Sequence, residues 1–364
     1  MSDLKFIFVH GLSGWGSYDK AYEKMPYWGM RGGDLMAFLR SRGFPSYAAS
    51  VAQGGSAWDR ACELYAQLAG LKTDYGAAHS SSYRHERYGR DFSSCPLIPE
   101  WNDSTRLVLI GHSFGGTTIR LFSELLTHGA PEEQADTPQE ELSGLFAGGI
   151  ENRICSIVTL ASPINGTSAY DLSEDEGFDP RQVKVPFWSK GFAKMMSMGA
   201  KPKKDGREET DYADYDMHID NALKLNDRIS TLPSVYYFSV PCCSTVPAED
   251  GTCVPDLAKT DPLFVSRSYQ IGRYTGITKG GTVIDETWHR NDGLVNTLSA
   301  MAPFGTPQKQ LDRNDIRPGI WNVFPIYNGD HMSMQGGLFR KNDIRDFYID
   351  LLEIISRAVN GYII

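Results

Sequence analysis

Apolar runs of strand length alternate with helical patterns along this chain. Residues 107–110 are four consecutive aliphatic residues, a pattern that predicts a buried strand. After residues 111–115, apolar side chains recur with helical spacing, which predicts a helix through Ile119, Phe122, Leu125 and Leu126. The runs 4–9 and 320–324 predict two further strands, and a last helical pattern follows at Ile344, Phe347, Leu351 and Ile355. Buried strands followed by helices predict an α/β protein.

The turn after strand 107–110 reads Gly-His-Ser-Phe-Gly, at residues 111–115. It fits the G-x-S-x-G nucleophile elbow, in which a strand turns sharply into a helix and lifts a serine hydroxyl above the sheet. Glycines suit this turn because side chains next to a strained serine would collide. An ordinary glycine-rich turn is the alternative, but the strand before it and the helix after it favour Ser113 as a nucleophile.

A serine nucleophile needs a base and an acid. In proteins with this nucleophile elbow the chain order is serine, acid, histidine. His331 is the predicted base because it lies in a polar turn between strand 320–324 and the final helix. The predicted acid is Asp292, in the segment Asn-Asp-Gly-Leu-Val-Asn, with Asp256 and Asp285 as alternatives.

An oxyanion hole in such a site uses the amide after the nucleophile and a second amide from the loop after the first strand. The first of these is Phe114. Strand 4–9 is followed by His-Gly-Leu-Ser-Gly at residues 10–14, so the Leu12 amide is the predicted second donor.

Six longer motifs are spread from end to end of the chain. They are HGLSGWG at 10–16, YWG at 27–29, WDRACE at 58–63, DYGAAH at 74–79, NDGLVN at 291–296 and YNGDH at 327–331. Together they resemble the bacterial thermoalkalophilic lipases, an α/β-hydrolase family with a structural zinc ion, and their clostridial polyester-hydrolysing relatives. The resemblance implies an α/β-hydrolase fold, with a mostly parallel central sheet flanked by helices. It also implies Ser113, Asp292 and His331 as the triad.

The resemblance further implies a zinc site. The family's ligands match Asp59, His79, His85 and Asp216, with Asp214 or His218 as alternatives to the last. Two imidazoles and two carboxylates form a closed tetrahedral set, which suits a structural zinc ion. Three of these ligands lie in a predicted zinc-binding insertion, residues 57–103. Without the resemblance, both histidines would be interpreted as surface residues.

The family's calcium site does not carry over to this chain. Ser333 stands where the family has an acidic residue, two positions after the catalytic histidine. Calcium is therefore left out of the prediction.

The long stretch between Ser113 and Asp292 predicts a lid or cap insertion, residues 168–230. Within it, residues 187–198 predict a lid helix with an adaptable apolar face that lies over the site or on lipid. The apolar residues of this helix are Phe187, Trp188, Phe192, Met195 and Met196. A helix packed into the core is the alternative.

Composition narrows the class of protein further. The 364 residues, 41% of them hydrophobic, suit a single domain over residues 1–364 with insertions. A net charge of −9 and the lack of a basic cluster argue against nucleic acid or an anionic membrane as a partner. No apolar run approaches membrane-spanning length. Cys242, Cys243 and Cys253 are candidates for a disulfide within one loop.

The sequence thus predicts a hydrolase that cleaves carboxylic esters, such as lipids, through a serine acyl-enzyme, with synthetic polyesters as further substrates. An acyltransferase on the same fold, a metallohydrolase using the Asp/His cluster and a non-catalytic binding protein are the alternatives. The first strand begins near residue 4, so the chain is expected to be a mature secreted form or else a cytoplasmic protein. The family resemblance favours secretion.

Overall fold

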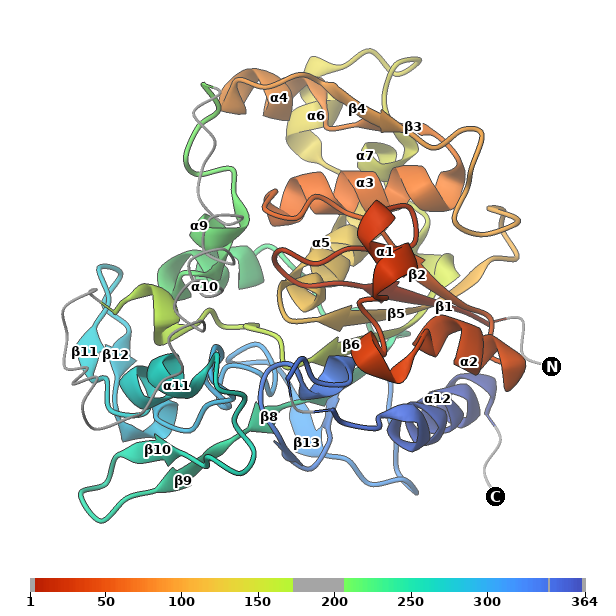
Figure 1. Ribbon diagram of the computed structural model, residues 1–364. Helices are drawn as coiled ribbons and strands as arrows, with labels where there is room; N and C mark the ends of the chain where they lie inside the picture. The colour runs from red at the N-terminus through yellow and green to blue at the C-terminus, as the bar shows by residue number, and fades with distance from the viewer. Residues whose placement is uncertain (1–3, 173–205, 340, 362–364) are drawn as a thin grey trace.

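The computed structural model describes residues 4–172, 206–339 and 341–361. A seven-stranded sheet lies at its centre, and every neighbouring pair of strands in it is parallel (Figure 1). From one edge to the other the strands are β13 (Gln308–Gln310), β14 (Trp321–Val323), β7 (Tyr236–Val240), β6 (Ile154–Leu160), β5 (Arg106–His112), β1 (Leu4–Val9) and β2 (Ser46–Ala49). Parallel neighbours need long crossover connections, which the helices supply.

Helices cover both faces of the sheet. Figure 1 shows α3 (Ala57–Ala69) and α5 (Phe114–His128) on one side, and α2 (Leu35–Ser41) and α12 (Arg345–Asn360) on the other. Because both faces are covered, the strands can be apolar runs without a polar side.

Each face of the sheet has its own apolar core. Ile7 and Leu109 belong to the core under α3 and α5, whereas Phe8 and Ile110 belong to the core under α2 and α12. Successive residues of a strand point to opposite faces, so one apolar run supplies both cores. The strands predicted at 4–9, 107–110 and 320–324 and the helices predicted after 115 and after 344 are confirmed.

The remaining elements are short. The helices are α1 (Lys20–Lys24), α4 (Ala77–Tyr83), α6 (Pro131–Asp136), α7 (Gly144–Ala147), α9 (Ala213–Met217), α10 (Ile219–Asn226) and α11 (Val265–Ile271). The 3-10 helices are η1 (Met30–Gly32), η2 (Glu151–Arg153), η3 (Ser168–Tyr170), η4 (Glu286–Trp288) and η5 (Ser333–Gln335). Four two-stranded sheets pair β3 (Lys72–Asp74) with β4 (Tyr88–Asp91), β8 (Cys242–Cys243) with β15 (Tyr327–Asn328), β9 (Thr245–Pro247) with β10 (Cys253–Pro255), and β11 (Gly276–Ile277) with β12 (Val283–Ile284).

The predicted zinc-binding insertion, residues 57–103, includes α3, which packs in the main core through Ala61, Leu64 and Leu68. The part that stands out from the sheet is β3, α4 and β4, at the top of Figure 1. The predicted range thus holds both a core helix and this protruding part, and its bounds stay a prediction.

Of the predicted lid, 168–230, the structure describes the two ends, which hold η3, α9 and α10. The predicted lid residues Phe187, Trp188, Phe192, Met195 and Met196 lie outside the described residues.

All six cysteines are free, so the disulfide considered among Cys242, Cys243 and Cys253 is not formed. Among the helices of the described ranges, none combines the length and the apolar composition needed to cross a bilayer.

The candidate functional loops leave the sheet at the carboxyl ends of its strands. Ser113 follows β5, and the predicted oxyanion loop follows β1. The short parallel pair of β8 with β15 continues this edge and carries the turn with His331 towards it. The backbone N–H of His331 donates to the Asp292 carbonyl at 2.8 Å, which joins the two turns. Parallel topology thus places residues that are distant in the chain at one edge, where α/β proteins bind ligands.

Candidate active site and metal-ligand cluster

Ser113 occupies the turn between β5 and α5 in a strained backbone conformation. Its φ is 55° and its ψ is −130°, a combination that residues other than glycine rarely adopt. A Cβ at Gly111 would lie 2.4 Å from the carbonyl carbon of Gly115, and a Cβ at Gly115 would lie 2.2 Å from the carbonyl oxygen of Val9. Only glycine fits at either position, and the local geometry is that of a nucleophile elbow.

Ser113, His331 and Asp292 form one hydrogen-bonded chain. Ser113 Oγ lies 2.9 Å from His331 Nε2, and His331 Nδ1 lies 2.8 Å from Asp292 Oδ2. All three residues are buried. Asp292 Oδ1 accepts backbone N–H groups from Leu294 at 3.0 Å and Val295 at 2.8 Å. A carboxylate held in this way keeps the imidazole proton on Nδ1 and leaves Nε2 to accept the serine proton.

The two alternative acids, Asp256 and Asp285, accept hydrogen bonds from backbone N–H groups of their own turns. Asp285 accepts the Thr287 N–H at 3.0 Å at the start of η4, and Asp256 accepts the Ala258 N–H at 2.9 Å. Asp292 is the carboxylate that faces His331.

His112, the residue before the nucleophile, joins the triad to the oxyanion loop. Its Nε2 donates to the His331 carbonyl at 2.8 Å, and its Nδ1 lies 2.8 Å from the hydroxyl of Tyr27. The same hydroxyl accepts the Gly11 N–H at 2.9 Å. Burial, and after it the charge of His331, hold the pKa of His112 well below its usual range. The sequence prediction missed this neutral histidine because the elbow pattern allows any residue at its position.

The two predicted oxyanion donors stand next to the nucleophile, and their N–H groups make no hydrogen bond to the described residues. A Cβ at Gly11 would lie 2.7 Å from Ser113 Cβ, so the loop that carries Leu12 passes directly against the serine. Phe114 begins α5. Within the described ranges, the N–H groups of Leu12 and Phe114 donate no backbone hydrogen bond. Two unpaired donors beside a nucleophile are the arrangement that stabilises a negative oxygen.

A second polar cluster lies between α3 and the β3–α4–β4 insertion. Asp59, His79, His85 and Asp211 each offer one ligand atom, and these atoms lie within 4.8 Å of one another. His79 Nε2 lies 3.4 Å from Asp59 Oδ1 and 3.3 Å from Asp211 Oδ1, and His85 Nε2 lies 3.3 Å from Asp211 Oδ2. Asp59 Oδ1 and both Nε2 atoms are buried without a hydrogen-bond partner among the described residues.

The donor set fits zinc. A tetrahedral ion with bonds of about 2.0–2.1 Å holds its ligand atoms about 3.3 Å apart, close to the separations in the cluster. His85 Nδ1 donates to the Glu86 carbonyl at 2.9 Å, which leaves the Nε2 lone pair for a metal. Buried polar atoms normally have partners, and one cation would satisfy all three unpaired atoms.

Asp211 takes the place predicted for Asp216. Asp216 Oδ2 instead accepts the Ala57 N–H at 2.7 Å, at the start of α3. The alternatives Asp214 and His218 are also outside the cluster, since Asp214 accepts the Tyr215 N–H and the His218 ring lies against Tyr170. The chain carries three aspartates between 211 and 216, and only the path of the backbone decides which one faces the histidines.

Arg207 closes the outer side of the cluster. Its guanidinium donates to Asp59 Oδ2 and to Asp211 Oδ2, whereas the Oδ1 atom of each aspartate faces His79. The arginine therefore offsets the charge of both carboxylates and fixes their orientation.

Ser333, at the position where the family has an acidic residue, donates its hydroxyl to Asp330 at 2.9 Å. Asp330 Oδ1 accepts from Met332 N–H and Ser333 Oγ, and its Oδ2 accepts from Asp261 N–H. Asp261 in turn accepts the N–H groups of Leu263 and Phe339.

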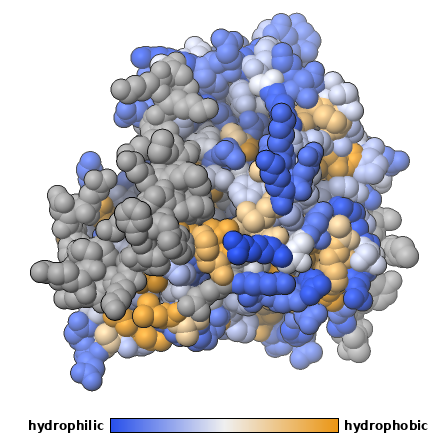
Figure 2. Space-filling model, in the orientation of Figure 1, coloured by the Kyte–Doolittle hydropathy of each residue, from blue (hydrophilic) through white to orange (hydrophobic). Residues whose placement is uncertain are grey.

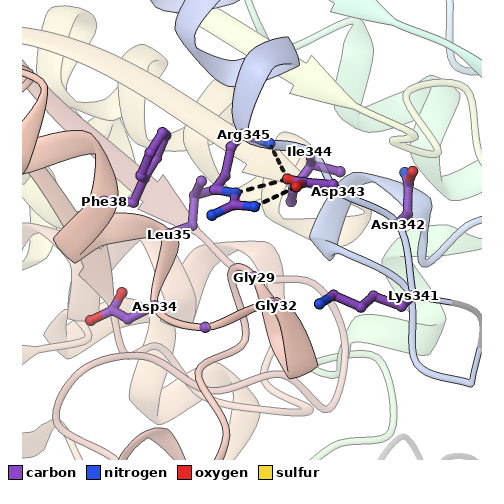
Figure 3. Close-up of a pocket in the computed structure, with 11 residues that line it drawn as sticks. Gly29, Gly32, Asp34, Leu35, Phe38, Lys341, Asn342, Asp343, Ile344 and Arg345 are labelled. Carbon is purple, nitrogen blue, oxygen red and sulfur yellow. Dashed lines mark hydrogen bonds and ion pairs between the residues drawn. The ribbon is translucent and has the colours of Figure 1, made fainter.

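Two cavities lie outside the triad. One of about 360 Å³ opens beside the metal-ligand cluster, with Trp58, His79, Tyr83 and Asp211 in its wall. The other, of about 90 Å³, lies between α2 and the start of α12 (Figure 3). The Arg345–Asp343 ion pair, with Nε and Oδ1 2.9 Å apart, forms one of its walls. Neither cavity contains a triad residue, so we assign no substrate to them.

Known proteins resemble this chain over nearly its whole length. The family model described as "Lipase-like, C-terminal domain" matches residues 3–186 and 203–359. The lipase of Staphylococcus hyicus is 32% identical over 390 residues, which cover 98% of this chain and 57% of that protein. Lipase 2 of Staphylococcus aureus is 33% identical over 383 residues, which cover 97% of this chain and 54% of that protein. The chain therefore spans about half the length of these curated relatives.

Solved structures agree with the sequence relatives. EstA from Clostridium botulinum has a TM-score of 0.84 and 30% identity, covering 98% of this chain and 87% of that one. Staphylococcus hyicus lipase has a TM-score of 0.80 and 30% identity, covering 99% and 97%. The chain thus has an α/β-hydrolase fold and belongs to the bacterial lipase family described as "Lipase-like, C-terminal domain".

Proposed function

We propose that this chain is a carboxylic ester hydrolase, a lipase or esterase that works through a serine acyl-enzyme. The observation that carries the proposal is the chain of hydrogen bonds from Ser113 through His331 to Asp292, at 2.9 and 2.8 Å. It lies beside the backbone N–H groups of Leu12 and Phe114, which have no partner among the described residues and can hold the anionic oxygen of acyl transfer. The family relatives named lipases support the same reaction class.

The reaction has two halves. His331 Nε2 takes the Ser113 proton while Oγ bonds to the ester carbonyl carbon, and the carbonyl oxygen becomes an anion held by the Leu12 and Phe114 amides. The tetrahedral intermediate collapses, and the C–O bond to the alcohol breaks as His331 returns the proton to the leaving oxygen. Water then attacks the acyl-enzyme in the same way, releasing the carboxylic acid and restoring Ser113. Asp292 holds the imidazole tautomer and stabilises its positive form.

The substrate is proposed to be an ester with an apolar acyl chain at a lipid–water interface. Large apolar side chains are exposed at Val246, Leu257, Ile277 and Val283. Hydrophobic residues gather at the lower left of Figure 2, where Figure 1 places α11 and β10. An exposed apolar surface marks a place of contact with lipid or another apolar surface. Hydrolysis of polyesters and secretion from the cell remain predictions of the sequence.

Asp59, His79, His85 and Asp211 are proposed to hold a structural zinc ion. Four protein ligands fill a tetrahedral shell and leave no position for water or substrate. The ion would join α3, the β3–α4–β4 insertion and the segment before α9, so its contribution is to stability. A metallohydrolase would need an open position, which this donor set does not offer.

The proposal is tested by hydrolysis of short- and long-chain p-nitrophenyl esters by wild type and Ser113→Ala. We expect kcat to fall on the order of 10⁴-fold or more, because the nucleophile is lost while the fold is kept. Ser123→Ala, at a second buried serine of α5, is the matched control and should keep wild-type activity. Activity that survives in Ser113→Ala would overturn the proposal. An added alcohol acceptor in the same assay distinguishes hydrolysis from acyl transfer.

A further inference from the structure

Arg60 is a fully buried cation on α3, directly after the cluster residue Asp59. Its Nε donates to Thr118 Oγ1 at 2.8 Å, and its Nη1 donates to the Ala52 carbonyl at 2.9 Å and the Gly11 carbonyl at 3.4 Å. Its Nη2 donates to the His10 carbonyl. One guanidinium therefore links the loop after β1, the loop after β2 and the start of α5 through hydrogen bonds.

Arg60 contacts the Gly11–Leu12 peptide directly, and it contacts Phe114 through its ring and through Thr118. The Gly11 carbonyl and the Leu12 N–H belong to one peptide unit, which is planar and trans, so they point in opposite directions. The Gly11 oxygen accepts from Arg60 at 3.4 Å and from His10 Nδ1 at 2.8 Å, and donors that hold it on one side orient the Leu12 N–H on the other. On the second donor, Arg60 lies 5.1 Å from the Phe114 ring centroid, and the Thr118 hydroxyl that it contacts donates to the Phe114 carbonyl at 3.1 Å.

We propose that Arg60 is a positioning residue for the oxyanion hole, which aims the Leu12 and Phe114 amides at the ester carbonyl oxygen. This inference rests on the proposed ester hydrolysis. Arg60 touches no reacting atom and acts through the peptide groups that it fixes. A hydrogen bond from a cation to the Gly11 oxygen also polarises that peptide and strengthens its N–H as a donor.

A buried arginine can also serve stability alone, and Arg120 is the matched control for that role. It lies on α5, is 3% exposed, and donates to Asn226 Oδ1 at 2.8 Å, away from the oxyanion loop. Burial lowers the pKa of Arg60 and of Arg120 alike, to about 10. The two residues therefore differ in their contacts more than in their environment.

The test compares Arg60→Gln, Arg60→Lys, Arg120→Gln and Ser113→Ala with wild type, on a short-chain p-nitrophenyl ester. The second readout is the inhibition constant of a trifluoromethyl ketone, whose adduct with Ser113 places a negative oxygen in the oxyanion hole. In Arg60→Gln we expect kcat to fall about 10- to 100-fold, because small displacements of a catalytic group have effects of this size. KM should stay within about threefold, as for a contact made mainly in the transition state. The ketone should bind more weakly by the same factor as kcat falls.

Arg60→Lys keeps the charge and should recover part of both losses, and it decides the case if Arg60→Gln does not fold. Arg120→Gln should lower the melting temperature but leave kcat and ketone binding near wild type. The inference is overturned if folded Arg60 variants keep wild-type kcat and ketone affinity, or if Arg120→Gln lowers both to the same extent. An active Ser113→Ala would instead overturn the proposed function, and the inference with it.

Discussion

At the scale of single residues, the oxyanion loop depends on a histidine that is buried and neutral. His10 Nδ1 donates to the Gly11 carbonyl at 2.8 Å, and His10 Nε2 accepts the Val51 N–H at 3.2 Å. Burial, and after it the charge of Arg60, lower the pKa of His10 to about 3. The ring thus has a fixed tautomer, and a proton on Nε2 would break one bond and place a second positive charge beside Arg60.

The lowered pKa of His10 makes the free energy of unfolding depend on pH. Because the folded-state pKa lies below the unfolded value of 6.5, its contribution is present above pH 6.5 and is lost as the pH falls from 6.5 towards 3. Between pH 8 and pH 5 the loss from His10 alone is about 2 kcal/mol. His10→Asn removes the titrating imidazole while keeping a donor near the Nδ1 position, so it should lose less stability over this pH range. Urea unfolding at both pH values measures the difference.

The urea unfolding experiment also compares His10→Asn with wild type at a single pH. His10→Asn should be less stable than wild type at pH 8, since the Val51 N–H loses its acceptor. His128→Asn, at an exposed histidine, controls for the loss of an imidazole as such. Equal losses from pH 8 to pH 5 in wild type and His10→Asn would show that His10 does not couple folding to pH.

At the scale of elements, the elbow requires α5 to begin very close to β1. The Cβ of an alanine at position 115 would lie 2.2 Å from the Val9 carbonyl oxygen and 2.8 Å from the His10 carbonyl oxygen. Backbone atoms of a central strand cannot move away as a flexible side chain can. Gly115→Ala must therefore displace the start of α5, and with it Ser113 and the Phe114 amide.

We expect Gly115→Ala to lower the free energy of unfolding by about 1–3 kcal/mol, the usual range for overpacking, and to lower kcat as well. Gly32→Ala is the control, since nothing lies within 4 Å of a Cβ at that position. Urea unfolding and ester hydrolysis are measured on both variants. Wild-type stability and activity in Gly115→Ala would contradict the close approach of α5 to β1.

At the scale of the whole molecule, the metal-ligand cluster joins parts of the chain that are distant in sequence. Asp59 comes from α3 in the main core, His79 from α4 in the insertion, and Asp211 from the segment before α9. A cation there would stabilise the folded state and not the unfolded chain, where the ligands are far apart.

Removal of metal with a strong chelator should therefore lower the melting temperature by at least about 5 °C. Asp211→Asn should hold less than one zinc ion per chain, by elemental analysis, and should no longer respond to the chelator. Asp216→Asn, which changes the carboxylate that accepts the Ala57 N–H, should keep both the metal and the response. The opposite result in the two variants would restore Asp216 as the ligand.

The parts of this protein that follow from local patterns could be predicted from the sequence. The apolar runs of β1 and β5 predict strands, because an apolar run has to be buried whatever the rest of the chain does. The elbow could be placed at Ser113, because two glycines and a serine between a strand and a helix permit few other backbone paths. Chain order and the turn before the last helix pointed to His331, but order alone left Asp256 and Asp285 beside Asp292 as possible acids, and the contact with His331 decides for Asp292.

The contacts between distant segments were decided only by the tertiary structure. The choice of Asp211 over Asp216 depends on where the backbone before α9 meets α3, and three nearby aspartates look alike in the sequence. The hydrogen bonds from Arg60 to the oxyanion loop join residues about fifty positions apart, and their acceptors are backbone carbonyls, which every residue possesses. Because every residue has a backbone carbonyl, the sequence does not show which carbonyls will accept these bonds. That is decided only when packing brings the segments together.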